Sequence, residues 1–143
     1  MPDDSETIAG VPLPVIPDLF NPGCALPYGL EVEHIRKAMF DFIEFLEFIN
    51  LQLHAKGMPR LEMFLMPASF SSIVGEFANL TIPRYCSGLV KNKYHNGHPD
   101  LIPTGIFLND AVRYTHDGIE VKGSRHGSGW QGHNPEAIWL MVY

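Results

Sequence analysis

Apolar side chains recur every three or four residues through the stretch 29–56, and this spacing predicts the main helix of the chain. With 3.6 residues per helical turn, such positions fall on one face: Ile35, Met39, Phe42, Leu46, Ile49 and Leu53. Lys56 and Gly57, followed by Pro59, predict the end of this helix. Because further phenylalanines broaden the stripe, we expect the helix to be covered on more than one side, by its own domain or by a second copy.

A second helix and several short strands follow. The pattern predicts a connector at 58–68 and a helix at 70–82, capped by Ser69 or Ser71. Beyond it, short apolar runs bounded by turn residues predict strands at 89–90, 101–102, 106–108, 112–115 and 119–122, the last two forming a hairpin, and a buried apolar strand at 138–143. This order predicts an α/β fold with a small central mixed sheet flanked by helices.

Composition limits the class of protein. The chain has 143 residues, of which 45% are apolar and 18% charged, which is typical of one globular domain. We assign that domain to residues 29–143 and read the proline-rich residues 1–28 as an N-terminal arm. No apolar run approaches the ~20 residues that cross a bilayer, and the acidic start does not resemble a signal peptide. The expectation is therefore a cytoplasmic protein, without membrane association, whose two cysteines are reduced.

Two acids and a lysine carry the candidate chemistry. Glu120 and Lys122 are two residues apart in a strand pattern, so they share one face while Val121 points to the core. Asp100 follows Pro99 at the start of another apolar run and can join them if the two segments pair. Two carboxylates beside an ammonium are suited to holding a hard divalent cation. On its own, Glu120 with Lys122 also fits a surface ion pair on an edge strand.

Pro99-Asp100, a spacer, and Glu120-Val121-Lys122 together resemble the signature of the PD-(D/E)xK nuclease superfamily, over about residues 70–143. The resemblance implies a restriction-endonuclease-like core and hydrolysis of DNA phosphodiester bonds with Mg²⁺, for which Mn²⁺ can substitute. It also implies a magnesium-dependent endonuclease that acts on double-stranded DNA, as restriction or phage and mobile-element enzymes do, and that forms a homodimer.

The resemblance further implies roles for particular residues. Asp100 and Glu120 would be metal ligands, with the backbone carbonyl of Val121 as a third, and Lys122 would act as a base or stabilise charge. Glu76 matches a helix glutamate that many of these nucleases aim at the metal; alternatively it lies on the solvent face. One departure is that the superfamily places a helix after the Glu-x-Lys strand, whereas residues 123–136 are rich in glycine.

The DNA contacts are expected just after the motif. Ser124, Arg125 and His126 follow the catalytic strand and are placed to meet the phosphate backbone, and Gln131 lies in a loop able to read base edges. The net charge of −6 is uneven, since residues 84–143 hold six Lys or Arg against five acids. A nucleic-acid surface in that half is one interpretation, and ordinary solvated loops and charge are the other.

Histidines offer a competing interpretation from another functional class. Four of them have ligand-like spacing: His95, His98, His126 and His133. They would hold a structural zinc ion in a non-catalytic DNA- or protein-binding module with the same fold. His98, next to Pro99 and Asp100, would otherwise support the carboxylate site or contact phosphate.

Overall fold

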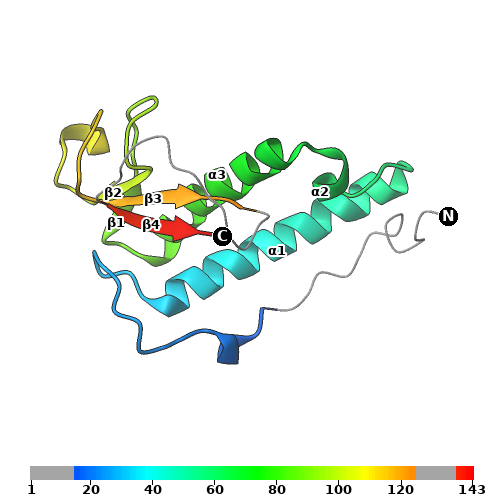
Figure 1. Ribbon diagram of the computed structural model, residues 1–143, viewed down its shortest axis with the longest axis horizontal. Coiled ribbons are helices and arrows are strands. Elements are labelled where there is room, and N and C mark those ends of the chain that lie inside the picture. The colour runs from blue at the N-terminus through cyan, green and yellow to red at the C-terminus, as the bar shows by residue number, and fades with distance from the viewer. Residues whose placement is uncertain (1–14, 125–137) are drawn as a thin grey trace.

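The computed structural model describes residues 15–124 and 138–143, and two long helices and a small sheet make up most of it (Figure 1). Helix α1 spans Val32–Ala55 and helix α3 spans Pro67–Tyr85, with the single-turn helix α2, Leu61–Phe64, between them. Short 3₁₀ helices lie at Pro17–Leu19 and Leu108–Asp110. The expected helix at 29–56 is therefore confirmed with slightly shorter bounds.

The four strands form one mixed sheet. They are β1 (Leu89–Lys91), β2 (Leu101–Pro103), β3 (Ile119–Lys122) and β4 (Trp139–Val142), in the order β1-β2-β3-β4. The first three pair antiparallel, and β4 pairs with β3 in parallel. The predicted α/β class with a small mixed sheet is thus confirmed.

Caps explain where the helices begin and end. Glu31 caps α1, its side chain accepting from the backbone of His34 while the His34 ring accepts from the Glu31 N–H, and Gly57 follows the last turn with φ of 70°. Helix α3 begins at Pro67 rather than at a serine cap, because proline needs no N–H partner in the first turn. It also continues through Pro83 to Tyr85, so the predicted bounds of 70–82 were too narrow.

The core lies between the sheet and α3, and α1 packs against α3 (Figure 1). Its buried members come from both helices and three strands: Ala38, Ala78, Ile82, Cys86, Leu89, Leu101, Ile119 and Val121. Leu30 joins this cluster, and Leu26 and Tyr28 pack on it, so the end of the expected arm lies against the domain. No helix among the described residues is both long and apolar enough to cross a membrane.

The segment between β2 and β3 differs from the prediction. Residues 106–108 form no strand, because Gly105, Asn109 and Asp110 all have positive φ and turn the chain. Two of the apolar side chains that suggested a strand, Ile106 and Leu108, are exposed instead, Leu108 by 86%. Residues 112–115 form no hairpin with 119–122, since β3 pairs with β2 and only Tyr114 bridges to His98.

The last strand also differs in its burial. Strand β4 was expected to be buried, but Trp139, Leu140 and Val142 are exposed. Within the described residues, β4 pairs only with β3 and forms one edge of the sheet. The residue after β4 extends the ladder, since the Tyr143 N–H donates to the Lys122 carbonyl and the Ser124 N–H donates to the Tyr143 carbonyl.

Candidate active site

The β2–β3 pairing brings Asp100 and Glu120 together. Leu101 pairs with Ile119 in an antiparallel register, which sets the two acids opposite each other. The Val121 N–H donates to Asp100 Oδ2 at 3.0 Å, and the Asp100 N–H donates to Glu120 Oε2 at 3.2 Å. The expectation that Asp100 joins the Glu120 strand is therefore met, and each carboxylate is held by the backbone of the other's segment.

Glu120 is a buried charge with two further partners. Its side chain is on the opposite face from the core residues Ile119 and Val121, and the residue is only 7% exposed. Lys122 Nζ lies 2.7 Å from Oε1, and His98 Nδ1 lies 3.0 Å from Oε2. Because β3 lies inside the sheet, the interpretation of Glu120 and Lys122 as an exposed edge-strand pair is wrong.

The local environment disfavours the ionised form of Asp100. Burial, and then the neighbouring Glu120 carboxylate, raises the pKa of Asp100 above its usual value, while the Val121 N–H and Lys122 act in the opposite direction. Two close carboxylates of which one is hard to ionise are a common feature of functional sites. A divalent cation bound between them would remove this repulsion.

Glu76 lies near this site without joining the carboxylate pair. It lines the same hollow of about 280 Å³ as Asp100, Glu120 and Lys122. Its side chain is 66% exposed and is ion-paired with Lys91 Nζ at 2.9 Å. Glu76 is therefore both solvent-exposed and beside the site, and its role as a ligand stays a prediction.

The expected third ligand and the DNA-contacting residues are only partly described. Val121 buries its side chain in the core as predicted, and a metal-binding role for its carbonyl stays a prediction. Ser124 lies just past β3 and binds the backbone of Tyr143. Arg125, His126 and Gln131 lie outside the described residues, as does most of the segment 123–136 in which the superfamily has a helix.

The zinc interpretation rests partly on residues that are not described, His126 and His133. Of the other two, His98 contacts Glu120 and stacks on Tyr114, with ring centroids 5.6 Å apart. Over residues 15–124 and 138–143, no three His, Cys, Asp or Glu side chains converge as a metal site. The placement of His98 favours its alternative role beside the carboxylates.

The donor chemistry of the site nevertheless fits magnesium. Mg²⁺ prefers hard oxygen ligands and keeps several waters, so one or two protein carboxylates suffice. Asp100 and Glu120 supply these. Asn79 lines the same hollow, and its buried Oδ1 has no hydrogen-bond partner. Such an orphaned acceptor is what a bound cation would satisfy.

A second hollow, of about 650 Å³, adjoins the first and was not anticipated from the sequence. Both are lined by Glu76, Asn79 and Asp100, and the second extends to Lys91, Lys93, Tyr94 and His95. The loop that carries Tyr94 is fixed by the buried Asn92, whose amide group donates to the carbonyls of Pro99 and Val112 and accepts from the N–H groups of Tyr94 and Val112. The only feature of the sequence that pointed to this hollow is that Lys91 and Lys93 are two residues apart.

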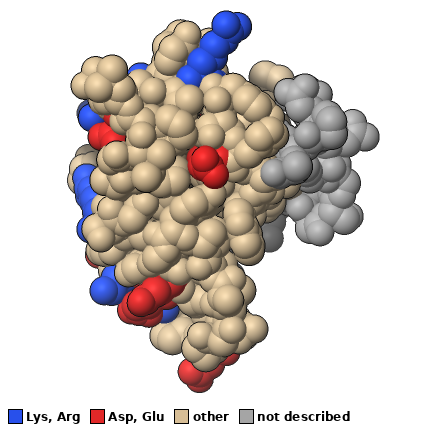
Figure 2. Space-filling model, turned by 90° about the vertical axis from the view of Figure 1, so that its left-hand side faces the viewer, with Lys and Arg blue, Asp and Glu red and all other residues tan. Residues whose placement is uncertain are grey.

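Charge on the visible surface is sparse. Figure 2 views the left-hand side of Figure 1, toward which the loops between β1 and β3 extend, and this face is mostly uncharged with Lys and Arg near its margin. This face carries no broad basic patch of the kind that binds duplex DNA without sequence preference.

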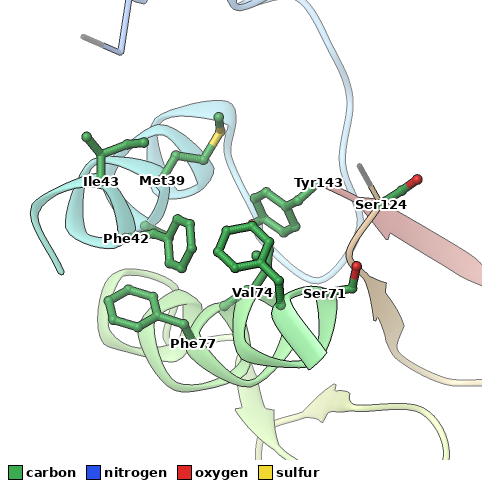
Figure 3. Close-up of a pocket in the computed structure, with 11 residues that line it drawn as sticks. Met39, Phe42, Ile43, Ser71, Val74, Phe77, Ser124 and Tyr143 are labelled. Atoms are coloured by element: carbon green, nitrogen blue, oxygen red, sulfur yellow. The ribbon is translucent and has the colours of Figure 1, made fainter. Parts of the chain in front are cut away.

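An apolar cavity of about 230 Å³ lies between α1 and α3. Met39, Phe42 and Ile43 from α1 face Val74 and Phe77 from α3, and Ser71, Ser124 and Tyr143 lie toward one end (Figure 3). Burial raises the pKa of Tyr143, so this hydroxyl stays protonated. The described side chains that line this cavity include no carboxylate, histidine or lysine. The candidate catalytic groups line the hollow of Asp100 and Glu120 instead, which shares Ser71 with this cavity.

No protein-family model, curated protein or solved structure matches the chain. A functional assignment therefore depends on the geometry of the site alone.

Proposed function

We propose that the chain is a metal-dependent endonuclease that hydrolyses DNA phosphodiester bonds at Asp100, Glu120 and Lys122. The observation that carries this proposal is the pair of interlocked carboxylates on β2 and β3, with the Lys122 ammonium on the same face. A simple ion pair between Glu120 and Lys122 would leave the second carboxylate, Asp100, unexplained, whereas a cation held between the two carboxylates accounts for both.

The fold proposed for this enzyme is a restriction-endonuclease-like core. The order of the elements along the chain supports this fold. Helix α3 precedes three antiparallel strands, Asp100 lies directly before the second strand, and Glu120 lies on the third. Strand β4 adds in parallel to the third. Parallel pairing requires a crossover, for which residues 123–138 supply the length.

Each residue has a distinct role in this proposal. Asp100 and Glu120 hold Mg²⁺, or Mn²⁺ in its place. The ion, when bound, polarises the phosphodiester and lowers the pKa of a coordinated water. Lys122, ion-paired with Glu120, lies where its ammonium can offset the negative charge that builds up on the phosphate. His98 orients Glu120 from the other side by donating to Oε2.

The DNA is proposed to reach the site along the second hollow. Lys91 and Lys93 line this hollow and are proposed to contact phosphates, and the exposed Tyr94 ring is proposed to stack on a base. Ser124, together with Arg125, His126 and Gln131, remains the proposed contact set after β3.

Plasmid cleavage tests the proposal. Purified protein is incubated with supercoiled DNA in Mg²⁺, in Mn²⁺ and in EDTA, comparing wild type with Asp100→Asn and Lys122→Met. We expect nicking or linearisation only with metal, and a loss of at least 100-fold in both variants while circular dichroism stays unchanged. Asp117→Asn, an exposed carboxylate on the loop before β3, is the matched control and should keep full activity. Cleavage that survives both site variants would refute the assignment.

A further inference from the structure

Three asparagines are buried in the described part of the chain, and only one of them has an amide oxygen without a hydrogen-bond partner. Asn50 binds Leu61 and Glu62, and Asn92 makes four hydrogen bonds to loop backbone. Asn79 is only 3% exposed, yet its Oδ1 has no hydrogen-bond partner. Since burying an unpaired amide oxygen costs free energy, an orphaned group of this kind requires an explanation.

The position of Asn79 supplies an explanation for its unpaired amide oxygen. It lies on α3, one helical turn after Glu76, and it lines both hollows where they meet at Asp100. The side chain of Glu76, in contrast, is largely exposed and is paired with Lys91. Of the two α3 residues, Asn79 is therefore the one that is buried at the site and has an unused acceptor.

We propose that the amide oxygen of Asn79 is a ligand of the divalent cation held by Asp100 and Glu120. An amide oxygen is a hard neutral ligand of the kind that Mg²⁺ and Mn²⁺ accept. It completes the site without adding a third negative charge beside two carboxylates that already repel each other. It also explains why no group of three acidic, histidine or cysteine side chains is found among the described residues, since the third ligand is of another type.

This inference rests on the proposed metal site, and cation binding without DNA tests the two separately. Mn²⁺ affinity is measured by calorimetry or electron paramagnetic resonance, and thermal unfolding is recorded in EDTA. For Asn79→Leu, which removes the orphaned oxygen at similar volume, we expect Mn²⁺ affinity to fall at least 10-fold while the metal-free melting temperature is unchanged or higher. For Asn79→Asp, which keeps an oxygen and adds charge, we expect tighter Mn²⁺ binding.

Asn50→Leu is the matched control, because it removes a buried amide that is satisfied and belongs to the α1–α2 contact. It should lower the melting temperature and leave Mn²⁺ affinity unchanged.

The inference is overturned if Asn79→Leu and Asn79→Asp both bind Mn²⁺ as wild type does, or if Asn79→Leu is destabilised as much as Asn50→Leu. If wild type binds no Mn²⁺, the metal site itself fails, and the proposed function fails with it. If wild type binds Mn²⁺ and Asp100→Asn binds it equally well, the carboxylate pair is not the cation site, which refutes the proposed function and, with it, this inference.

Discussion

Asp100 lies in an environment that disfavours its charged form. Its folded-state pKa is raised by burial and by Glu120, so folding favours the protonated form. The resulting destabilisation is full above the raised pKa, decreases as the pH falls through it, and is gone below the ordinary pKa of an aspartate. Sites that bind cations commonly have this property, because the ligands are arranged for the ion rather than for the stability of the metal-free protein.

Replacing Asp100 by asparagine is therefore expected to stabilise the metal-free protein. Asparagine imitates the protonated carboxyl group and keeps an oxygen to accept the Val121 N–H. We expect the free energy of unfolding to rise by roughly 0.5–2 kcal/mol at pH 7.5. The difference from wild type should shrink in acid, where wild-type Asp100 becomes protonated.

Urea denaturation in EDTA at several pH values measures this effect. Asp117→Asn, on an exposed loop, should show no pH-dependent difference from wild type. Should Asp100→Asn be less stable than wild type at pH 7.5, Asp100 would be a structural residue rather than a poised ligand.

Residue-level prediction succeeded where strand periodicity decides the outcome. Because alternate strand residues share a face, the common orientation of Glu120 and Lys122 followed from their spacing alone. The orphaned oxygen of Asn79 was not predictable, since Asn79 looks like any polar residue in a helix and its burial depends on how α3 meets the sheet. Asn92 was missed for the same reason: its partners come from residues 94, 99 and 112.

At the scale of elements, the pairing of β2 with β3 depends on Gly118. Its φ is 142°, its N–H donates to the Tyr28 hydroxyl, and a Cβ there would lie 2.2 Å from the Leu101 carbonyl oxygen and 2.5 Å from the Pro99 ring. The backbone of β2 therefore approaches β3 at a distance that only glycine permits.

We expect Gly118→Ala to lower the free energy of unfolding by about 2–4 kcal/mol and to weaken Mn²⁺ binding, because the new methyl group separates Asp100 from Glu120. Urea denaturation and Mn²⁺ titration measure the two effects. Gly75→Ala on α3 is the control, since a Cβ there meets nothing within 4 Å. That change should raise stability by roughly 0.5–1 kcal/mol through helix propensity. Equal stability of the two variants would contradict the close approach described here.

Long helices were predicted more accurately from the sequence than short strands and turns. The apolar stripe of α1 extends over several turns, so its type and bounds were close to the observed Val32–Ala55. The stretch between β2 and β3 was misjudged because exposed Ile106 and Leu108 imitate a strand, while the decisive signal was the left-handed turn at Asn109 and Asp110. Strand β4 was correctly placed but misread as buried, since apolar composition does not distinguish an inner strand from an edge.

At the scale of the whole molecule, α1 carries large apolar side chains that the described residues leave uncovered. Phe40, Phe48 and Leu51 are exposed on this helix, Phe48 by 61%. Eleven residues complete about three helical turns, so Phe40 and Leu51 lie on the same side of the helix. Phe48 lies within about a quarter turn of them. Exposed charges such as Glu44 and Glu47 lie on the same side, and we propose that the expected homodimer pairs through the three apolar side chains among them.

A homodimer through α1 also has a consequence for cleavage. One chain holds one carboxylate pair, so cutting both DNA strands in a single event requires two copies.

We expect light scattering after size exclusion to give twice the chain mass for wild type and the monomer mass for Phe48→Glu, because a charge in an apolar interface is left unpaired. Asp117→Lys, at an exposed carboxylate on the loop before β3, should remain dimeric. In plasmid assays the Phe48→Glu monomer is expected to accumulate nicked circles, whereas the dimer produces linear DNA. A wild type that is monomeric at every concentration and still linearises plasmid in one step would contradict this arrangement, since a single site would then have cut both strands.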